Sequence, residues 1–165
     1  MEKVMRYQVA DYLNTGDSTE TYTLMGAGFN SLDESPSAQT ESTTYINDKS
    51  ATKYVKGYET TFPFDTDLIA DETAITFIYD IARNQKVGED AETDYVRVEL
   101  FSPVASKDNT YKARKFKVSV EVSDITGEGA SIMKVSGNLN GVGDFIDGEF
   151  NTTTKTFTAA GAVQA

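Results

Sequence analysis

The strongest constraint on this chain is a strict two-residue alternation in the segment 112–122, KARKFKVSVEV. Its apolar positions are Phe116, Val118, Val120 and Val122. Its polar positions are Lys115, Lys117, Ser119 and Glu121. Because successive side chains of a β-strand point to opposite faces of a sheet, this pattern predicts an antiparallel strand with one face buried and the other in water.

The same kind of signal recurs along most of the chain. Short runs rich in β-branched and aromatic residues, separated by turn residues, predict strands at 21–26, 28–34, 93–101, 131–140, 143–150 and 154–159. The Thr- and Ser-rich stretch 37–45 predicts a further extended segment that is exposed. These segments indicate an antiparallel, mainly β protein.

One segment has helical instead of strand periodicity. In 71–85, DETAITFIYDIARNQ, Ala74, Phe77, Ile78 and Ile81 recur at helical spacing, and Asp71 is the expected N-cap. A chain of 165 residues is long enough for one domain with its own core. The sequence therefore predicts a single domain over 1–165: a mainly β, two-sheet antiparallel sandwich or barrel-like arrangement with one flanking α-helix.

The segment 45–65, YINDKSATKYVKGYETTFPFD, raises a separate question about packing. Its first part is small and polar. In its second part Tyr54, Tyr58, Phe62 and Phe64 alternate with polar or small residues. This predicts one strand from Lys53 to Phe64, with the aromatic side chains on one face, that emerges from a long polar excursion.

Composition excludes several classes of function. The chain has no cysteine, no histidine and no tryptophan. Without histidine or cysteine there are no Ser-His or Cys-His catalytic units and no zinc–sulfur sites, so we expect no enzyme activity, no metal and no cofactor. A net charge of −11 opposes binding to the phosphate backbone of nucleic acids. The N-terminal residues lack the apolar core of a signal peptide, and no apolar run in the sequence is long enough to span a bilayer. We therefore expect no membrane association.

Three short motifs resemble ligand-binding loops but fail on detail. Gly26-Ala27-Gly28 and Gly141-Val142-Gly143 do not complete GxGxxG and do not open a helix, so they predict tight turns. Asp65-Thr66-Asp67 starts like a calcium loop, but Ile69 occupies the next ligand position. None of these motifs predicts a site.

Three longer segments carry a resemblance to a known family. They are MRYQVADYLN with YTLMGAGFNSLDESPSAQTESTTYINDKSAT, then YVKGYETTFPFDTDLIADETAITFIYDIARNQKVG, and finally GDFIDGEFNTTTKTFTA. In order and spacing they resemble the major tail tube proteins of long-tailed, non-contractile bacteriophages. The resemblance covers most of the chain, and its motifs are structural rather than catalytic.

This resemblance implies an assembly. Six subunits form a ring in which their strands join one β-barrel around a lumen, and rings stack into a tube that conducts DNA without binding it specifically. The implied partners are further copies of the chain, a tape-measure protein, a tail terminator, and distal tail or baseplate proteins. The implied location is the virion tail, assembled in the cytoplasm of the host bacterium.

Two sets of residues follow as site predictions within this family. Polar positions on the predicted strands are candidates for the lumen: Glu59, Thr61, Asn138, Asn140, Asp147 and Glu149. The resemblance also implies that about 40–64 forms a loop or hairpin that projects to the next ring, followed by the strand that returns into the sheet with its aromatic face inward. Positions in this excursion are candidates for contact with the next ring: Thr43, Tyr45, Asn47, Asp48, Lys49 and Lys53.

Two alternatives stay open at the level of sequence. The chain resembles, less closely, the tube of a contractile tail or tailocin, which has the same kind of function. A β-sandwich ligand-binding or adhesin module belongs to another class, and the absence of tryptophan disfavours it for sugars.

Overall fold

The computed structural model describes residues 1–161, so the last four residues of the predicted 1–165 domain lie outside the described part. The fold is mainly β, with antiparallel strands and one α-helix, which confirms the predicted fold class. The strands are β1 (Val9–Asn14), β2 (Tyr22–Leu24), β3 (Phe29–Leu32), β4 (Ala38–Thr43), β5 (Thr52–Tyr58), β6 (Thr61–Asp67), β7 (Glu92–Pro103), β8 (Thr110–Thr126), β9 (Lys134–Gly141), β10 (Ile146–Asn151) and β11 (Thr156–Ala159). Helix α1 spans Thr73–Arg83, and the 3-10 helices η1 and η2 span Arg6–Gln8 and Gly88–Ala91.

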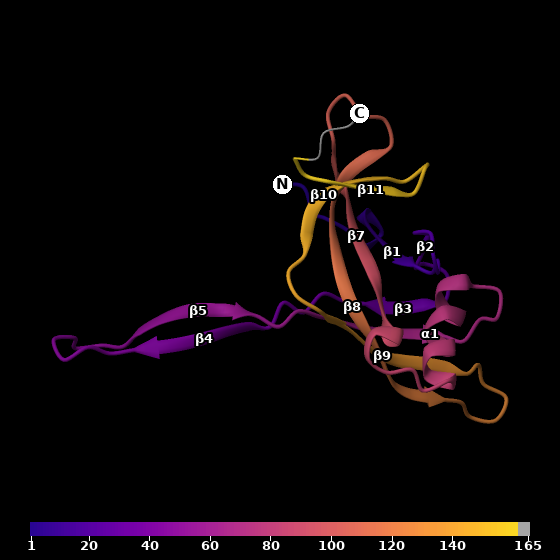
Figure 1. The fold of residues 1–165 in the computed structure, drawn as a ribbon, viewed down its shortest axis with the longest axis horizontal. Coiled ribbons are helices and arrows are strands. Elements are labelled where there is room, and N and C mark those ends of the chain that lie inside the picture. The colour runs from indigo at the N-terminus through magenta and orange to yellow at the C-terminus, as the bar shows by residue number, and fades with distance from the viewer. Residues whose placement is uncertain (162–165) are drawn as a thin grey trace.

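The long strand β8 joins the two halves of the molecule (Figure 1). Its first part, up to Ser119, pairs with β7, and the same part pairs with β10 on its other side. Its second part, from Val118 onward, pairs with β9. The sheet order β2-β1-β7-β8-β9-β6-β3 folds into a sandwich-like arrangement, and the described residues do not close it into a barrel.

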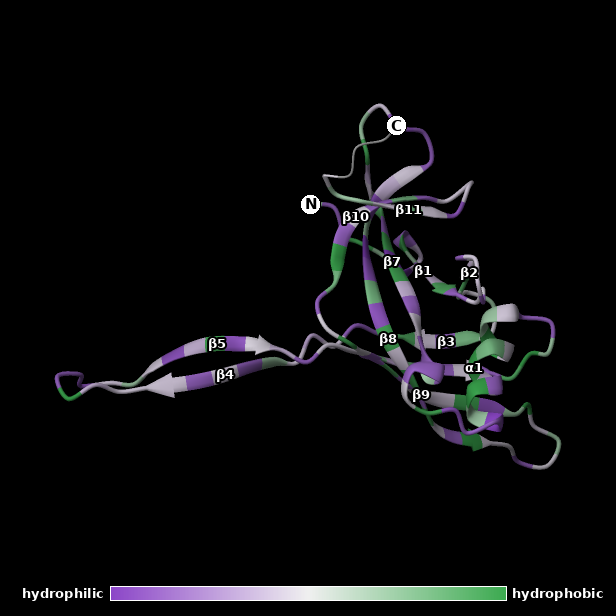
Figure 2. Ribbon diagram, in the orientation of Figure 1, coloured by the Kyte–Doolittle hydropathy of each residue, from purple (hydrophilic) through white to green (hydrophobic). Residues whose placement is uncertain are grey.

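Two apolar clusters lie on opposite faces of β7. Tyr95 belongs to the larger cluster beneath α1, where its ring centroid lies 4.7 Å from that of Phe62. Val96 belongs to the smaller cluster with Tyr12 and Phe150, whose ring centroids are 4.5 Å apart. Figure 2 shows apolar residues along β7 and α1, whereas β4 and β5 are largely hydrophilic. The core therefore lies in the body, away from the β4–β5 hairpin.

The predicted single strand from Lys53 to Phe64 is wrong, because the structure divides this segment between β5 and β6. Phe62 and Phe64 are buried, but Tyr54 and Tyr58 are 47% and 65% exposed. The cause lies in the pairing. β6 lies between β3 and β9 over the core, whereas β5 pairs with β4 in a two-stranded sheet outside the body.

Strand β1 was not predicted. Three consecutive residues in it, Asp11, Tyr12 and Leu13, are all buried. Leu13 contacts the larger cluster and Tyr12 the smaller one, so both faces of the strand are covered. A strand buried on both faces has no polar–apolar alternation, which is why the sequence pattern missed it.

Helix α1 lies within the predicted range, but its N-cap is Glu72 and not Asp71, and Glu72 makes no capping side-chain hydrogen bond. Its C-terminus ends in a Schellman motif: Lys86 N donates to Ile81 O (3.0 Å), and Gln85 N donates to Ala82 O (3.1 Å). Within residues 1–161, no helix is long and apolar enough to cross a membrane.

Gln85→Gly is expected to stabilise the protein. Gln85 has φ +50, a left-handed conformation that favours glycine at this position of the motif. The expected gain in free energy of unfolding is about 0.5–1 kcal/mol. Urea denaturation measures it, with Gln85→Ala as the matched control, because alanine offers no relief from the positive φ. A glycine variant less stable than the parent chain would contradict this account.

Candidate assembly surfaces

Strands β3, β6, β9 and the second part of β8 form a four-stranded unit whose outer face is polar. Residues directly opposite each other in an antiparallel pair point to the same face, so their side chains form rows across the strands. The first row crosses β6, β9, β8 and β7 and consists of Thr61, Asn140, Ser119 and Glu92. The second row, on β6, β9 and β8, consists of Pro63, Asn138 and Glu121. The third row, on β3, β6, β9 and β8, consists of Ser31, Asp65, Ser136 and Asp124. The opposite face of the same strands packs into the larger cluster.

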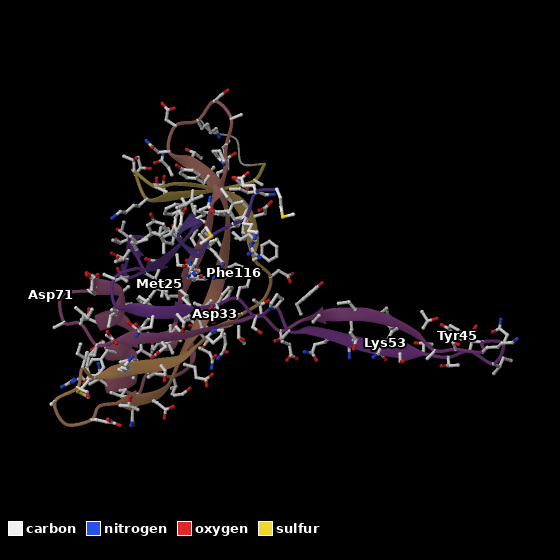
Figure 3. The ribbon with its side chains drawn as sticks, turned by 180° about the vertical axis from the view of Figure 1, so that it is seen from behind. Met25, Asp33, Tyr45, Lys53, Asp71 and Phe116 are labelled. Carbon is white, nitrogen blue, oxygen red and sulfur yellow. The ribbon has the colours of Figure 1, made fainter. Side chains whose placement is uncertain are left out.

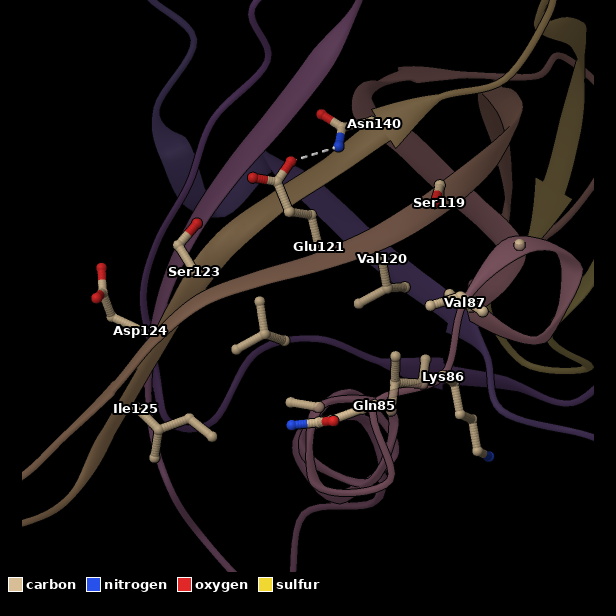
Figure 4. A pocket seen from close by; sticks show the side chains of 15 residues that line it. Gln85, Lys86, Val87, Ser119, Val120, Glu121, Ser123, Asp124, Ile125 and Asn140 are labelled. Atoms are coloured by element: carbon tan, nitrogen blue, oxygen red, sulfur yellow. Dashed lines mark hydrogen bonds between the residues drawn. The ribbon is translucent and has the colours of Figure 1, made fainter.

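This polar face is acidic. Asp65, Glu121 and Asp124 contribute carboxylates to it, and Glu121 Oε2 accepts a hydrogen bond of 2.7 Å from Asn140 Nδ2 (Figure 4). In the next row Lys134 Nζ lies 3.4 Å from Asp67 Oδ1, so the lysine neutralises the charge of this carboxylate. A surface of carboxylates, amides and hydroxyls repels phosphate groups or leaves them unbound.

Three of the predicted lumen residues meet on this face. Thr61 lies directly opposite Asn140, and Asn138 lies on the same strand face two residues away. Glu59 is exposed just before β6, and its backbone N donates to Ser37 O at 3.2 Å. The structure therefore places four of the six predicted residues on or beside one surface.

The other two predicted lumen residues lie elsewhere. Asp147 and Glu149 are on β10, which pairs with the first part of β8, opposite Arg114 and Lys112. Glu149 Oε2 also lies 2.8 Å from Lys107 Nζ. These two carboxylates belong to the other half of the molecule, where basic neighbours offset them.

The four-stranded unit has two outer strand edges without a partner in the described part of the chain. Among residues 1–161, β3 pairs with β6 alone, and β8 beyond Ser119 pairs with β9 alone. Beside this edge of β8 runs a groove of about 690 Å³ between the sheet and the C-terminal end of α1 (Figure 4). Ile81, Val87 and Val120 are among its lining residues, and Val87 is 78% exposed.

The β4–β5 hairpin is a two-stranded ribbon that projects from the body (Figure 1). A bulge between Gln39 and Thr40 shifts its register, so that Tyr54 lies opposite Glu41 and Tyr58 opposite Ala38. Because residues 38 and 41 of a strand point to opposite faces, the two tyrosines do as well. The ribbon thus presents an aromatic ring on each face.

The predicted ring-stacking residues all lie on this hairpin. Thr43 ends β4, Lys53 lies on β5, and the turn between them contains the others, Tyr45, Asn47, Asp48 and Lys49. Asp48 Oδ2 accepts a hydrogen bond of 3.0 Å from Tyr45 N and so closes the turn. Figure 3 shows Tyr45 and Lys53 far from the body.

A ladder of five charged side chains anchors the base of the hairpin. Arg6 Nη2 lies 2.6 Å from Asp11 Oδ2, and Arg97 Nη1 lies 3.3 Å from Asp11 Oδ1. Arg97 Nε lies 3.5 Å from Glu34 Oε1, and Arg114 forms two hydrogen bonds of 2.9 and 2.7 Å with Glu34. Glu34 lies in the loop that leads into β4. The ladder therefore ties η1, β1, β7 and β8 to the hairpin root.

The centre of the ladder is buried. Asp11 is 2% exposed, and it also accepts a hydrogen bond from the hydroxyl of Tyr95. Burial and then the Asp11 carboxylate hold the pKa of Tyr95 well above its ordinary value, so the phenol stays protonated and donates. A buried carboxylate that two guanidinium groups and a phenol surround is fully satisfied.

Sequence analysis did not single out this ladder. Its members lie far apart in the chain, and no spacing rule connects Asp11 to Arg97 or Glu34 to Arg114. The available signal was Asp11, a charge within the apolar run VADYL. Arg97 gave no signal, because it alternates with Val96 and Val98 and so falls on the polar face of its predicted strand.

No protein-family model and no curated protein matches the sequence. Among solved structures, a similar chain occurs in one described as the tail of an empty GTA (gene transfer agent) particle, determined by helical refinement with C6 symmetry. The TM-score is 0.59 and the identity 12%, and the match covers 95% of this chain and 100% of that one. At this identity the likeness establishes a shared fold, and it extends over nearly the whole chain.

Proposed function

We propose that this chain is a non-enzymatic structural protein of a phage-like tail. Six copies form a ring, and rings stack into a hollow tube through which DNA passes. The observation that carries this proposal is the four-stranded unit with two free edges and an acidic polar face. The C6 symmetry of the tail that contains a similarly folded chain supports it. The tape-measure, terminator and distal tail partners remain predictions from the family resemblance.

The direction of the strands favours closure into a ring. The unit runs β8-β9-β6-β3 with every pair antiparallel, so its two outer strands run in opposite directions. The free edge of β3 in one copy therefore meets the free edge of β8 in the next as another antiparallel pair. Closing the sheet this way removes the exposed edges, and the groove beside β8 receives side chains of the neighbour.

In this ring the polar face of the unit lines the lumen. Glu59, Thr61, Asn138 and Asn140 lie on or beside that face, together with Asp65 and Glu121. The larger cluster and α1 then lie on the outer side of the barrel wall. Asp147 and Glu149 are not part of this face, so we propose no lumen role for them.

Negative-stain electron microscopy of the purified, concentrated protein tests the assembly. We expect hollow tubes of uniform width or six-fold rings, with light scattering that rises with protein concentration. A protein that remains monomeric at every concentration, also when pre-formed tail fragments are added as seeds, would exclude the proposal. In that case binding to a glycan array would test the β-sandwich binding module.

Reversing charges in the lumen is expected to make tubes retain DNA. Asp65→Lys with Glu121→Lys replaces two carboxylates per copy by cations that bind phosphates, while the strands stay paired. Tubes of this variant should co-sediment with short DNA duplexes that nuclease does not degrade, and the parent tubes should not. The control, Glu89→Lys with Asp90→Lys, changes charge on the exposed η2. Equal nuclease protection in both variants would show that the polar face does not line the lumen.

A further inference from the structure

Strand β3 turns a backbone acceptor toward its free edge. Asp33 N donates to Pro63 O of β6 at 3.0 Å, so this N–H points into the sheet. The C=O of Leu32 belongs to the same trans peptide unit and therefore points the opposite way. In the proposed ring, Leu32 O is thus an acceptor for a backbone N–H of the β8 strand that a neighbouring copy adds to this edge.

In the single copy this acceptor is already occupied by a side chain. Arg6 Nη2 donates to Leu32 O at 3.0 Å and to Asp11 Oδ2 at 2.6 Å. Arg6 Nη1 donates to Val9 O at 2.8 Å. Paired strands lie about 4.7–4.9 Å apart, which leaves no room for a guanidinium group between Leu32 and a partner strand. Arg6 and a neighbouring strand therefore exclude each other at this position.

The 3-10 helix η1 holds Arg6 beside the edge. Gln8 N donates to Met5 O at 2.9 Å, and Met5 N donates to Gln8 Oε1 at 2.7 Å, so the turn is closed by its own hydrogen bonds. Tyr7 of this turn lines a groove of about 730 Å³ together with Asn30 of β3. The position of Arg6 across the edge is thus defined by the fold of the N-terminal segment.

The two ends of the Arg6 contact differ in burial. The side chain of Arg6 is 51% exposed, whereas that of Asp11 is 2% exposed. Asp11 also accepts hydrogen bonds from Arg97 Nη1 and from the hydroxyl of Tyr95, so its charge stays compensated when Arg6 moves. The guanidinium group that leaves Leu32 O enters water, which solvates it. The contact can therefore open while the body of the protein remains folded.

We propose that Arg6 is a latch that shields the edge of β3 in the isolated subunit and withdraws when β8 of a neighbouring copy pairs with this edge. This inference rests on the proposed ring. On pairing, Leu32 O exchanges the guanidinium group for a backbone N–H, so the acceptor is never left unpaired. The latch opposes ring closure, and it protects the edge from wrong strand pairing while the subunits are dilute. It thereby raises the protein concentration at which rings form.

Removing the guanidinium group tests the latch. Arg6→Met keeps an unbranched side chain but offers no donor to Leu32 O. It should lower the protein concentration needed for tubes about tenfold, because a hydrogen bond from a charged donor no longer opposes closure. The control Lys3→Met removes the same charge from the exposed start of the chain and should change that concentration less than about twofold. An Arg6→Met chain that is folded by circular dichroism and needs an equal or higher concentration would overturn the latch.

A helical reconstruction of parent tubes by electron microscopy gives a readout that does not depend on the folding of a variant. We expect Leu32 O to accept a hydrogen bond from the backbone of the neighbouring β8, with the guanidinium group of Arg6 beyond hydrogen-bond distance. Tubes in which Arg6 still donates to Leu32 O would overturn the latch and leave the proposed function standing. A parent chain that forms neither rings nor tubes, also with seeds, would refute the proposed function and the latch with it.

Discussion

A chain in which Asn-Gly replaces Ala38–Tyr58 is expected to fold normally and to form no tubes. Ser37 and Glu59 face each other at the base of the hairpin, where Glu59 N donates to Ser37 O at 3.2 Å, so a two-residue turn can join them. The removed residues contribute nothing to either apolar cluster. We therefore expect the free energy of unfolding to change by about 0.5 kcal/mol or less.

The effect on assembly should be much larger. If the hairpin contributes about 4 kcal/mol per copy to ring stacking, its loss raises the protein concentration needed for tubes about a thousandfold. Circular dichroism on heating measures the fold, and sedimentation with electron microscopy measures the tubes. Single rings should persist in the shortened chain, because the free edges of β3 and β8 remain. Tubes of normal length from this chain would show that stacking does not depend on the hairpin.

Where the sequence pattern succeeded, one face of a strand meets the core and the other meets water. β8 is the clearest case: Val118 is buried and the neighbouring Lys117 is exposed, so the alternation in the sequence matches the environment. The same reasoning found β7 and β9 within a few residues, as well as α1. Thr61, Asn138 and Asn140 meet because they occupy the polar face of strands that pair with each other.

Where the pattern failed, a long-range contact determined the local environment. β1 has no alternation because later strands cover both of its faces. The aromatic alternation of 53–64 continues through two strands with different partners, and only pairing decides that Tyr58 is exposed while Phe62 is buried. Asp147 and Glu149 fall on a polar strand face, but the pairing of β10 with the first part of β8 separates them from the polar face of β6 and β9.

The charged ladder could not be predicted from the sequence for the same reason. Asp11 and Arg97 are brought together because β1 pairs with β7 in a register that places them opposite each other. Glu34 joins them only because the chain turns from β3 toward the hairpin beside β8. The topology of the fold therefore decides which charged side chains meet in the ladder. The contribution of the ladder to the free energy of unfolding can be measured by substitution.

Asp11→Ala is expected to be the most destabilising single substitution of a charged residue. It leaves the guanidinium of Arg97, which is 12% exposed, facing a cavity and removes the acceptor of the Tyr95 hydroxyl. Arg97 would lose its buried carboxylate partner and keep only the partly exposed Glu34. Breaking a buried charge network by removing one member costs about 3–5 kcal/mol. For a domain of this size that corresponds to a fall in Tm of roughly 6–20 °C.

The matched control removes a carboxylate from an exposed pair. Asp80 lies 3.4 Å from Lys86 on the surface of α1, with both side chains more than a third exposed, so Asp80→Ala should cost less than about 1 kcal/mol. Urea denaturation of the three proteins compares the two losses directly. Because Arg97 also holds Glu34 at the hairpin root, Asp11→Ala should in addition increase hydrogen exchange at Glu34 and Ser35 under conditions where the body remains folded. A loss of stability no greater than that of Asp80→Ala would mean that the ladder orients the hairpin without stabilising the fold.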